Sequence, residues 1–390
     1  MPFYHSLGSL PRKRHIAFRS PGGRLHAEEL MGNHGFSGSS SLLYHVHPPT
    51  VVRATREVMR VPKVAADSRE LRHRHFRTAQ VPAGGSPTLH RTLLLFNDEV
   101  SMAVVHADHV DKHFFRNAQA DEILYVTKGT GTLETPFGRI AFADGDYLVI
   151  PRGIIYRLVF DPAAGPLTLL VIESRGMVRT PRRYRTEFGQ MKEGAPFSER
   201  DIRRPQFVEP RDETGEFPVL VKQYDAITEL VMAHHPFDVV GWDGYFYPYA
   251  FSIHDFEPIV GRVHQPPPVH QTFEGDGFVV CSFCPRPYDF HPEAIVVPYN
   301  HSNVESDEAL YYVSKEFMSR KGIEFGSITH HPDGLPHGPH PGRVEAAIGA
   351  THTDELAVML DSFRPMRVAV SALPFEDPSY ARSWLPEELT

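Results

Sequence analysis

The sequence lacks the features that would set it apart from ordinary globular proteins. It has only two cysteines among 390 residues, Cys281 and Cys284, so a disulfide framework is excluded. No apolar run approaches the ~20 residues that a membrane-spanning helix needs, and no basic run predicts a nucleic-acid surface. No apolar stretch of the secretory kind follows the basic residues Arg12, Lys13 and Arg14. We therefore expect a cytoplasmic protein whose partners include neither membrane nor nucleic acid.

The two cysteines form a C-x-x-C motif, which elsewhere marks a redox pair or half of a zinc site. The second half of such a zinc site is missing here. Residues 278–284 form an apolar run that predicts a strand. We therefore interpret both thiols as small core residues.

Proline and histidine are abundant. The chain has 35 prolines and 24 histidines, in a composition of 41% hydrophobic and 23% charged residues with a formal net charge of −8. Many prolines among short apolar alternations are typical of a mainly β protein with stiff loops. The histidines are too numerous to be ligands, so only their spacing can identify the functional ones.

Strand patterns begin near residue 91. Residues 91–96 and 100–105 flank the turn residues Asn97 and Asp98 and predict a hairpin. Short strands continue to about residue 173, and an Arg- and Pro-rich stretch with little apolar periodicity follows. Helical periodicity is confined to residues 225–234 and to residues 353–363, where Thr353 is a candidate N-cap.

An internal repeat determines the expected fold. The segment Asn-Ala-Gln-Ala-Asp-Glu at 117–122 precedes Ile-Leu-Tyr-Val, and Asn-Val-Glu-Ser-Asp-Glu at 303–308 precedes Ala-Leu-Tyr-Tyr-Val. A second pair of motifs follows in the same order and with identical spacing. Its members are Gly145, Pro151, Gly153 and Tyr156 in the first copy, and Gly326, Pro332, Gly334 and His337 in the second.

The repeat resembles the two motifs of the cupin superfamily, small antiparallel barrels of the jelly-roll kind. The resemblance covers roughly residues 90–175 and 240–375. It implies a mainly β bicupin, with two jelly-roll-like β-barrels and few helices. We predict an extension (1–90) that packs on the barrels, a first barrel (91–175), a connection (176–235) and a second barrel (236–390).

The two copies differ at three positions that could hold a metal. These are Phe115, Glu122 and Tyr156 in the first copy, and His301, Glu308 and His337 in the second. A carboxylate and two neutral imidazoles leave adjacent coordination positions open, as in the facial triad of Fe(II) oxygenases, although zinc and manganese suit the same ligands. We predict an Fe(II) centre at His301, Glu308 and His337, and a first barrel that has lost its metal site.

Asp307 competes with Glu308 as the carboxylate ligand. Successive side chains of an extended segment point to opposite faces, so only one of the two can face the metal. Glu308 shares a face with Leu310 and Tyr312, as an inward position should, and is the counterpart of Glu122. We favour Glu308 and keep Asp307 as the alternative.

Other histidines lie near these motifs. His264 and His270 flank a stiff, proline-rich segment that could hold a side chain at a cavity mouth. A neutral imidazole there could accept the proton of a phenolic substrate, although each could equally bond only to backbone. His330 and His331 are adjacent in a strand, so one of them should face the cavity.

Several segments are similar to the homogentisate 1,2-dioxygenase family. They are Pro-Phe-Asp-Val-Val-Gly-Trp-Asp-Gly at 236–244, Pro-Tyr-Asn-His-Ser-Asn at 298–303, Pro-His-Gly-Pro at 336–339, and parts of 25–44. The resemblance implies iron ligands at His301, at the acid at 307 or 308, and at His337. It implies a base histidine at His264 or His270, and a further active-site histidine at His331.

The resemblance also implies a reaction. Fe(II) and O2 would open the ring of homogentisate to 4-maleylacetoacetate, a step of tyrosine and phenylalanine catabolism, and the enzyme would be a homo-oligomer. The chain is shorter than the best-known members, and its carboxylate motif carries an extra residue. A related phenolic acid such as gentisate is therefore an alternative substrate. A metal-dependent cupin isomerase and a bicupin that only binds a small ligand are alternative functions.

Overall fold

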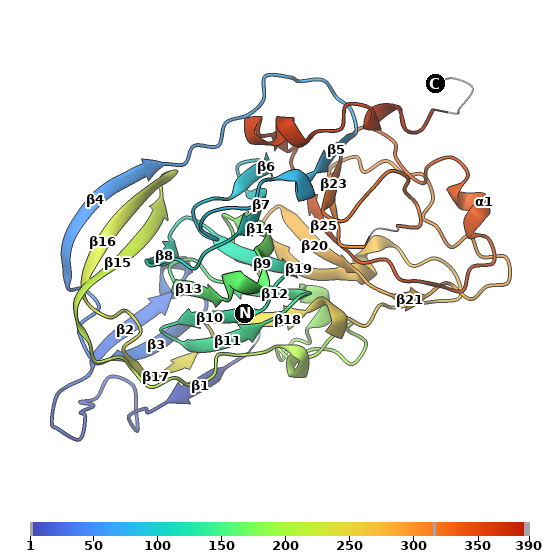
Figure 1. Cartoon of the computed structure of the whole chain (residues 1–390). Coiled ribbons are helices and arrows are strands. Elements are labelled where there is room, and N and C mark those ends of the chain that lie inside the picture. Colours follow the sequence, from blue (N-terminus) through green and yellow to red (C-terminus); the bar gives the residue numbers. More distant parts are fainter. Residues whose placement is uncertain (1–2, 315–316, 386–390) are drawn as a thin grey trace.

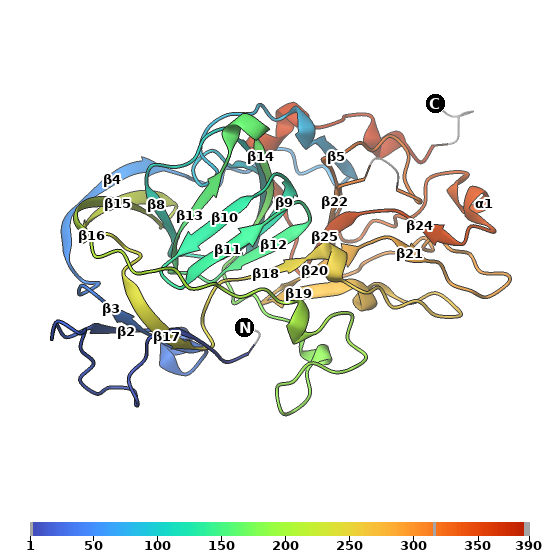
Figure 2. The ribbon, with the colours of Figure 1, turned by 60° about the horizontal axis from the view of Figure 1, so that its bottom comes forward.

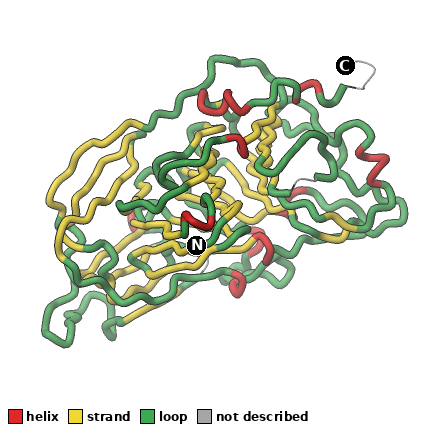
Figure 3. The backbone as a smooth tube through the Cα atoms, in the orientation of Figure 1, coloured by secondary structure: helices red, strands yellow, loops and turns green. Residues whose placement is uncertain are grey.

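The computed structural model describes residues 3–314 and 317–385, and these form a mainly β bicupin (Figures 1 and 3). The first barrel lies at the centre of Figure 1 and the second at its right. The strands of the first barrel pair almost entirely antiparallel in two seven-stranded sheets. One sheet contains, in order, β18 (Tyr249–Ser252), β12 (Asp146–Ile150), β9 (Asp121–Lys128), β14 (Leu167–Ser174), β7 (Val100–Ala107), β6 (Thr92–Phe96) and β26 (Arg367–Val368).

The other sheet of the first barrel continues into a long curved arm (Figure 1, left). Tyr224 and Asp225, both with positive φ, form the two-residue turn between two of its strands, as a type I′ hairpin requires. The strands are, in order, β11 (Gly138–Phe142), β10 (Gly131–Thr135), β13 (Ile155–Phe160), β8 (Phe114–Asn117), β15 (Thr214–Gln223), β16 (Ala226–His234) and β4 (Val52–Arg60).

The second barrel has one six-stranded sheet and a short two-stranded ladder, and loops cover much of its far side (Figure 3). The sheet contains β19 (Gln271–Gly275), β20 (Phe278–Phe283), β25 (Ala357–Ser362), β22 (Asp307–Tyr312), β23 (Ser327–His331) and β5 (Arg74–Arg77). The ladder pairs β21 (Arg286–Pro287) with β24 (His352–Thr353), close to the single described α-helix, α1 (Arg343–Ala347).

The two barrels pack against each other through sheet faces. The Tyr147 hydroxyl lies 2.8 Å from Ser282 Oγ, and Thr127 Oγ1 lies 2.9 Å from the Tyr311 hydroxyl. Alternate residues of β9 and β22 face this contact, so Glu122 and Glu308 face the barrel interiors instead. The packing thereby places the equivalent motif acids inside separate barrels.

The N-terminal extension contributes strands to three sheets. β4 completes the arm of the first barrel, and β5 pairs with β23 at the edge of the second. A further sheet joins β1 (His5–Gly8), β17 (Val239–Gly244), β3 (Ser40–His45) and β2 (Ala27–Gly32), seen at the lower left of Figure 2. Of the segment predicted to open the second barrel, β17 pairs in this sheet and β18 pairs with β12 of the first barrel.

Both predicted helices are wrong. Residues 226–234 form β16 within the segment predicted as a connection, because their β-branched side chains pair on both sides with β15 and β4. Residues 357–362 form β25 in the middle of the six-stranded sheet. A central strand is apolar on both faces, so its pattern does not distinguish it from a buried helix.

The predicted hairpin and the predicted cysteine strand are confirmed. β6 and β7 flank the turn at Asn97, and β20 carries Cys281. Cys281 and Cys284 are both buried and free, and burial raises the pKa of each thiol. Both are core residues, as the sequence predicted.

Candidate metal centre

His301 and His337 are brought together by the backbone. The two residues form an isolated antiparallel bridge, in which His301 N–H donates to His337 O at 2.8 Å and His337 N–H donates to His301 O at 2.9 Å. Glu308, near the start of β22, points into the same space. Residues far apart in sequence therefore converge at one end of the second barrel.

One donor atom from each of the three residues lies within 4.8 Å of the others. His337 Nε2 is 3.5 Å and His301 Nε2 is 3.9 Å from Glu308 Oε2. Two imidazole nitrogens and a carboxylate oxygen are a donor set that suits Fe(II), and also zinc or manganese. The structure thus brings together the predicted residues His301, Glu308 and His337.

The imidazoles are held with Nε2 toward the acid. His301 Nδ1 lies 3.0 Å from Tyr299 O, so Nδ1–H can donate there and leave the Nε2 lone pair free. His337 Nδ1 lies 3.4 Å from Leu335 O in the same sense. His337 Nε2 is buried and has no hydrogen-bond partner. An orphaned buried acceptor directed at a carboxylate fits a bound cation.

Glu308 is an ionised carboxylate. Burial opposes its ionisation, but the hydrogen bond with His331 and the nearby imidazoles of His301 and His337 outweigh burial and hold the pKa of Glu308 well below its usual range. The charge on Glu308 in turn raises the pKa of His301 against burial. The site therefore presents a negative charge to any ligand, as a cation site must.

Asp307 lies on the opposite face of β22. Its carboxylate is 2.8 Å from His330 Nε2 and accepts the backbone N–H groups of Asp333 at 2.8 Å and Met366 at 2.7 Å. In the first barrel the counterpart Asp121 accepts the backbone N–H groups of Arg152 and Val178, both at 2.9 Å. In both copies the acid on the outer face of its strand therefore binds the turn that follows a neighbouring strand of the sheet.

A cavity opens beside the triad. Its empty volume is about 890 Å³, open mouth included, and His301 and Glu308 line it. The walls are mainly apolar and aromatic; Arg286 and Arg320 are the cationic exceptions, and Asp289 and Glu355 are acidic ones besides Glu308. Arg286 is engaged by Glu355 at 2.7 Å. The apolar side chains are Ile259, Val260, Phe283, Val296, Leu310, Phe317, Met318 and Met359.

His264 and His270 both line this cavity. His264 Nδ1 is 3.8 Å from an Asp289 carboxylate oxygen, and its side chain is 33% exposed. His270 is buried against the Phe283 ring, with Nδ1 unpartnered, and burial lowers the pKa of His270 to about 3. His270 is therefore a neutral imidazole at pH 7.

His331 does not line the cavity. Its Nδ1 is 2.8 Å from Glu308 Oε1 and its Nε2 is 3.2 Å from the Tyr380 hydroxyl, behind the triad. Burial lowers the pKa of His331 well below its usual range, so a neutral ring donates one N–H to Glu308. Neither His330 nor His331 faces the cavity, contrary to the prediction for the pair, because each is bound to an acid of β22.

Sequence reasoning missed residues that surround the triad. His73 and Trp384, from opposite ends of the chain, place their rings beside His337 and His331 respectively, at centroid distances of 5.9 and 6.1 Å. Arg320 donates to Gly338 O at 2.5 Å and lines the cavity. None of these residues belongs to the repeat. Asp361 is the structural counterpart of Glu173, but it follows the second motif at a different spacing, so the repeat does not reveal it.

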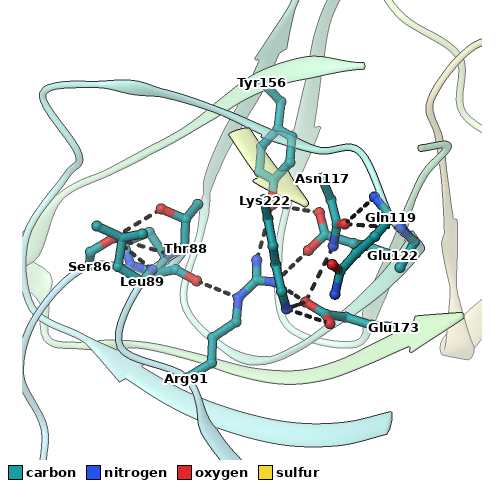
Figure 4. A network of polar contacts seen from close by, with 12 residues as sticks. Ser86, Thr88, Leu89, Arg91, Asn117, Gln119, Glu122, Tyr156, Glu173 and Lys222 are labelled. Atoms are coloured by element: carbon teal, nitrogen blue, oxygen red, sulfur yellow. Dashed lines mark hydrogen bonds and ion pairs between the residues drawn. The ribbon is translucent and has the colours of Figure 1, made fainter. Parts of the chain in front are cut away.

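The equivalent place in the first barrel contains a guanidinium (Figure 4). Arg91 Nη1 forms an ion pair with Glu122 and lies 3.1 Å from Glu173 Oε1, and Arg91 Nη2 donates to the Tyr156 hydroxyl at 3.0 Å. Lys222 Nζ lies 2.7 Å from Glu173 Oε2. In Figure 4 these side chains converge on one point. The Arg91 guanidinium also lies over the Phe115 ring, 5.6 Å from its centroid.

The fold and the site define a bicupin protein with one candidate metal centre. Among known families, a model described as "Homogentisate 1,2-dioxygenase N-terminal" matches residues 97–253. A protein of Saccharolobus solfataricus named "Putative dioxygenase SSO1533" is 41% identical over 387 residues, which cover 98% of this chain and 99% of that protein. The chain belongs to that protein's family, the cupin dioxygenases related to homogentisate 1,2-dioxygenase.

Enzymes named for the homogentisate reaction are more distant. The homogentisate 1,2-dioxygenase of Bradyrhizobium diazoefficiens is 27% identical over 292 residues, covering 70% of this chain but only 63% of the enzyme's length. A cupin-2 conserved barrel domain protein from Leptotrichia buccalis is a solved structure with 10% identity, a TM-score of 0.33, and coverage of 78% of this chain and 100% of that one. The bicupin assignment rests on the strand pairing.

No helix in the described part of the chain is long and apolar enough to cross a membrane.

Proposed function

We propose that this protein is an Fe(II)-dependent ring-cleaving dioxygenase of a small aromatic acid, with homogentisate as the first candidate substrate. The observation that carries the proposal is the junction of the triad with the cavity, because His301 and Glu308 belong to both. Membership in a dioxygenase family supports the reaction class. The named homogentisate enzymes support the substrate.

His301, Glu308 and His337 would hold the iron. The iron would supply a place where O2 and the substrate meet and a route for electrons between them. Cleavage adds the elements of one O2 to homogentisate and gives 4-maleylacetoacetate, so no further oxidant is required. The chain's own residues must position the ring, bind its acid group and accept its phenolic proton.

The cavity walls suit a planar ring carrying a carboxylate. Phe283, Leu310 and Phe317 exclude water around the ring and hold it by burial. Arg320 is the cationic side chain of the wall that has no ion pair among the described residues, and it would attract the carboxylate.

His264 is our candidate proton acceptor. It is partly exposed at the cavity, and its Nδ1 lies 3.8 Å from the carboxylate of Asp289, which can orient the ring toward the substrate. His270 would accept a hydrogen bond through its unpartnered Nδ1 without taking up the proton, since burial lowers the pKa of His270 to about 3. His331 would position Glu308 and not contact the substrate.

Oxygen uptake after anaerobic loading with Fe(II) tests the proposal. We expect one O2 consumed per homogentisate, with much lower uptake for the His264→Ala variant at unchanged iron content. Gentisate is the second substrate to test, because only 63% of the length of the homogentisate enzyme is matched. No uptake with any dihydroxy-aromatic acid by the iron-loaded protein would overturn the proposed activity.

A further inference from the structure

Asp361 stands beside Glu308 inside the second barrel. The two residues are direct cross-strand partners in the β22–β25 ladder, so their side chains share a face and their Cβ atoms lie about 4.5–5.5 Å apart. Met359 and Leu310 share that face two residues further on, and both line the cavity. Asp361 Oδ1 is buried and has no hydrogen-bond partner.

The first barrel has an acid at the same place. Glu173 of β14 is the direct cross-strand partner of Glu122 of β9, as Asp361 of β25 is of Glu308 of β22. In both barrels these are neighbouring strands of the sheet that packs against the other barrel. A pair of acids is thus a shared feature of the two interiors, and the barrels differ in what balances it.

Two side-chain cations balance the pair in the first barrel. Arg91 contacts both Glu122 and Glu173, and Lys222 contacts Glu173 at 2.7 Å. The two carboxylates, Glu122 and Glu173, and the two cationic side chains together carry no net charge. Burying the acids is tolerable because each has a cationic partner within hydrogen-bonding distance.

The second barrel contains no such cations. In the described part of the chain, Glu308 forms ion pairs with three histidines only, and Asp361 forms none. Arg320 lies near Glu308, but it donates hydrogen bonds to Gly338 O and Ser319 Oγ. Apart from Arg320 nearby, no cationic side chain in the described part of the chain lies against this pair of acids, and none forms an ion pair with either acid as Arg91 and Lys222 do in the first barrel.

We propose that Asp361 is a fourth residue of the metal centre, the second carboxylate that a divalent cation at His301, Glu308 and His337 needs for charge balance. This inference rests on the proposed metal site. Asp361 is outside the group of direct donor atoms. It acts as an outer partner, through the field it exerts at the cation and through a hydrogen bond that it accepts from a water beside the cation.

The affinity for Co(II), a coloured stand-in for Fe(II) that tolerates air, tests this role without any turnover. We expect Asp361→Asn and Asp361→Ala to weaken Co(II) binding by about 10–100-fold, the range typical of outer partners of metal ligands. The metal-free variants should unfold at the same temperature as the metal-free parent or above it, because an unpaired buried acid has been removed.

Glu173→Gln in the first barrel is the matched control. It removes the equivalent acid from a barrel with no metal triad, so it should lower the unfolding temperature and leave Co(II) affinity unchanged. Parent-like Co(II) affinity in both Asp361 variants would overturn the inference. The His337→Ala variant distinguishes a failure of the metal site from a failure of the role of Asp361. If His337→Ala and the Asp361 variants all retain Co(II), the proposed triad is wrong. If His337→Ala loses Co(II) and the Asp361 variants retain it, only the role of Asp361 is wrong.

Discussion

In the first barrel the motif acid Glu122 lies against a guanidinium, and in the second its counterpart Glu308 lies among three imidazoles. Both acids occupy the same place on equivalent strands. Tyr156, where the second barrel has His337, bonds to both Glu122 and Arg91. In the first barrel a cation attached to the chain thus occupies the place where we propose a metal ion in the second.

This difference in the two interiors changes what each barrel can do. The first interior is closed on itself, because Phe115 and Tyr156 are fully buried and Arg91 binds the acids. The second interior leaves His337 Nε2 unpartnered and opens to a cavity. The first barrel thus carries its own cation, and the second keeps open the space in which we propose a metal.

Removing the internal cation should give the largest effect. Arg91→Met leaves Glu122 and Glu173 buried without their shared partner, and breaking a buried ion pair costs about 3–5 kcal/mol. We expect that loss in the free energy of unfolding from urea titration of the metal-free protein, with unchanged Co(II) affinity. Arg56→Met is the control, since its pair with Glu229 is exposed and contributes about 0–1 kcal/mol. Equal losses in the two variants would remove the special role of Arg91.

Removing equivalent residues from each barrel should affect the metal in only one of them. His337→Ala deletes a proposed direct ligand and should weaken Co(II) binding by more than the ~10–100-fold typical of outer partners. Tyr156→Phe deletes only a hydroxyl that contacts Glu122 and Arg91, and should cost stability alone. Metal loss caused by Tyr156→Phe would show that the first barrel binds metal as well.

The triad residues were predictable because two copies of one motif could be compared within the chain. His301 and His337 stand out only against Phe115 and Tyr156, and strand alternation separates Glu308 from Asp307. The same comparison did not reveal Arg91, which lies outside both motifs and reaches Glu122 only through the fold. A residue such as Arg91, whose long side chain reaches the acid from outside both motifs, has no fixed spacing from them that could reveal its role in the sequence.

Other failures have topological causes. β5 completes the second barrel although its partner β23 lies some 250 residues later, and nothing in the four residues of β5 specifies that partner. β16 and β25 were predicted as helices because a short apolar segment fits either period. In both cases the neighbouring strands, and not local propensity, decide the structure.

Lowering the pH should affect the two barrels at different pH values. Lys222 and Arg91 outweigh burial and hold the pKa of Glu173 at about 2, below the ordinary value of 4.5. A lowered acid pKa stabilises the fold above pH 4.5 and loses that contribution, about 3 kcal/mol, as the pH falls to about 2. Metal release requires only protonation of the ligand side chains, so we expect it at a higher pH than the loss of the Glu173 contribution.

Metal content and circular dichroism followed in one pH titration check this order. We expect Co(II) to leave while the strand signal stays intact. The parent protein should lose stability between pH 4.5 and 2, and the Glu173→Gln variant should not show this loss. Simultaneous loss of metal and strand signal would mean that the metal, and not the Arg91 network, supports the fold.

The smallest effect should be the same in both barrels. Asp307 and Asp121 each accept two backbone N–H groups on the outer face of their strands. An Asn amide turns one acceptor into a donor facing an N–H group, so Asp307→Asn and Asp121→Asn should each destabilise the protein by about 1–3 kcal/mol. Neither should change Co(II) affinity, whereas Glu308→Gln should. A loss of Co(II) binding confined to Asp307→Asn would exchange the two acids and require β22 to turn its other face inward.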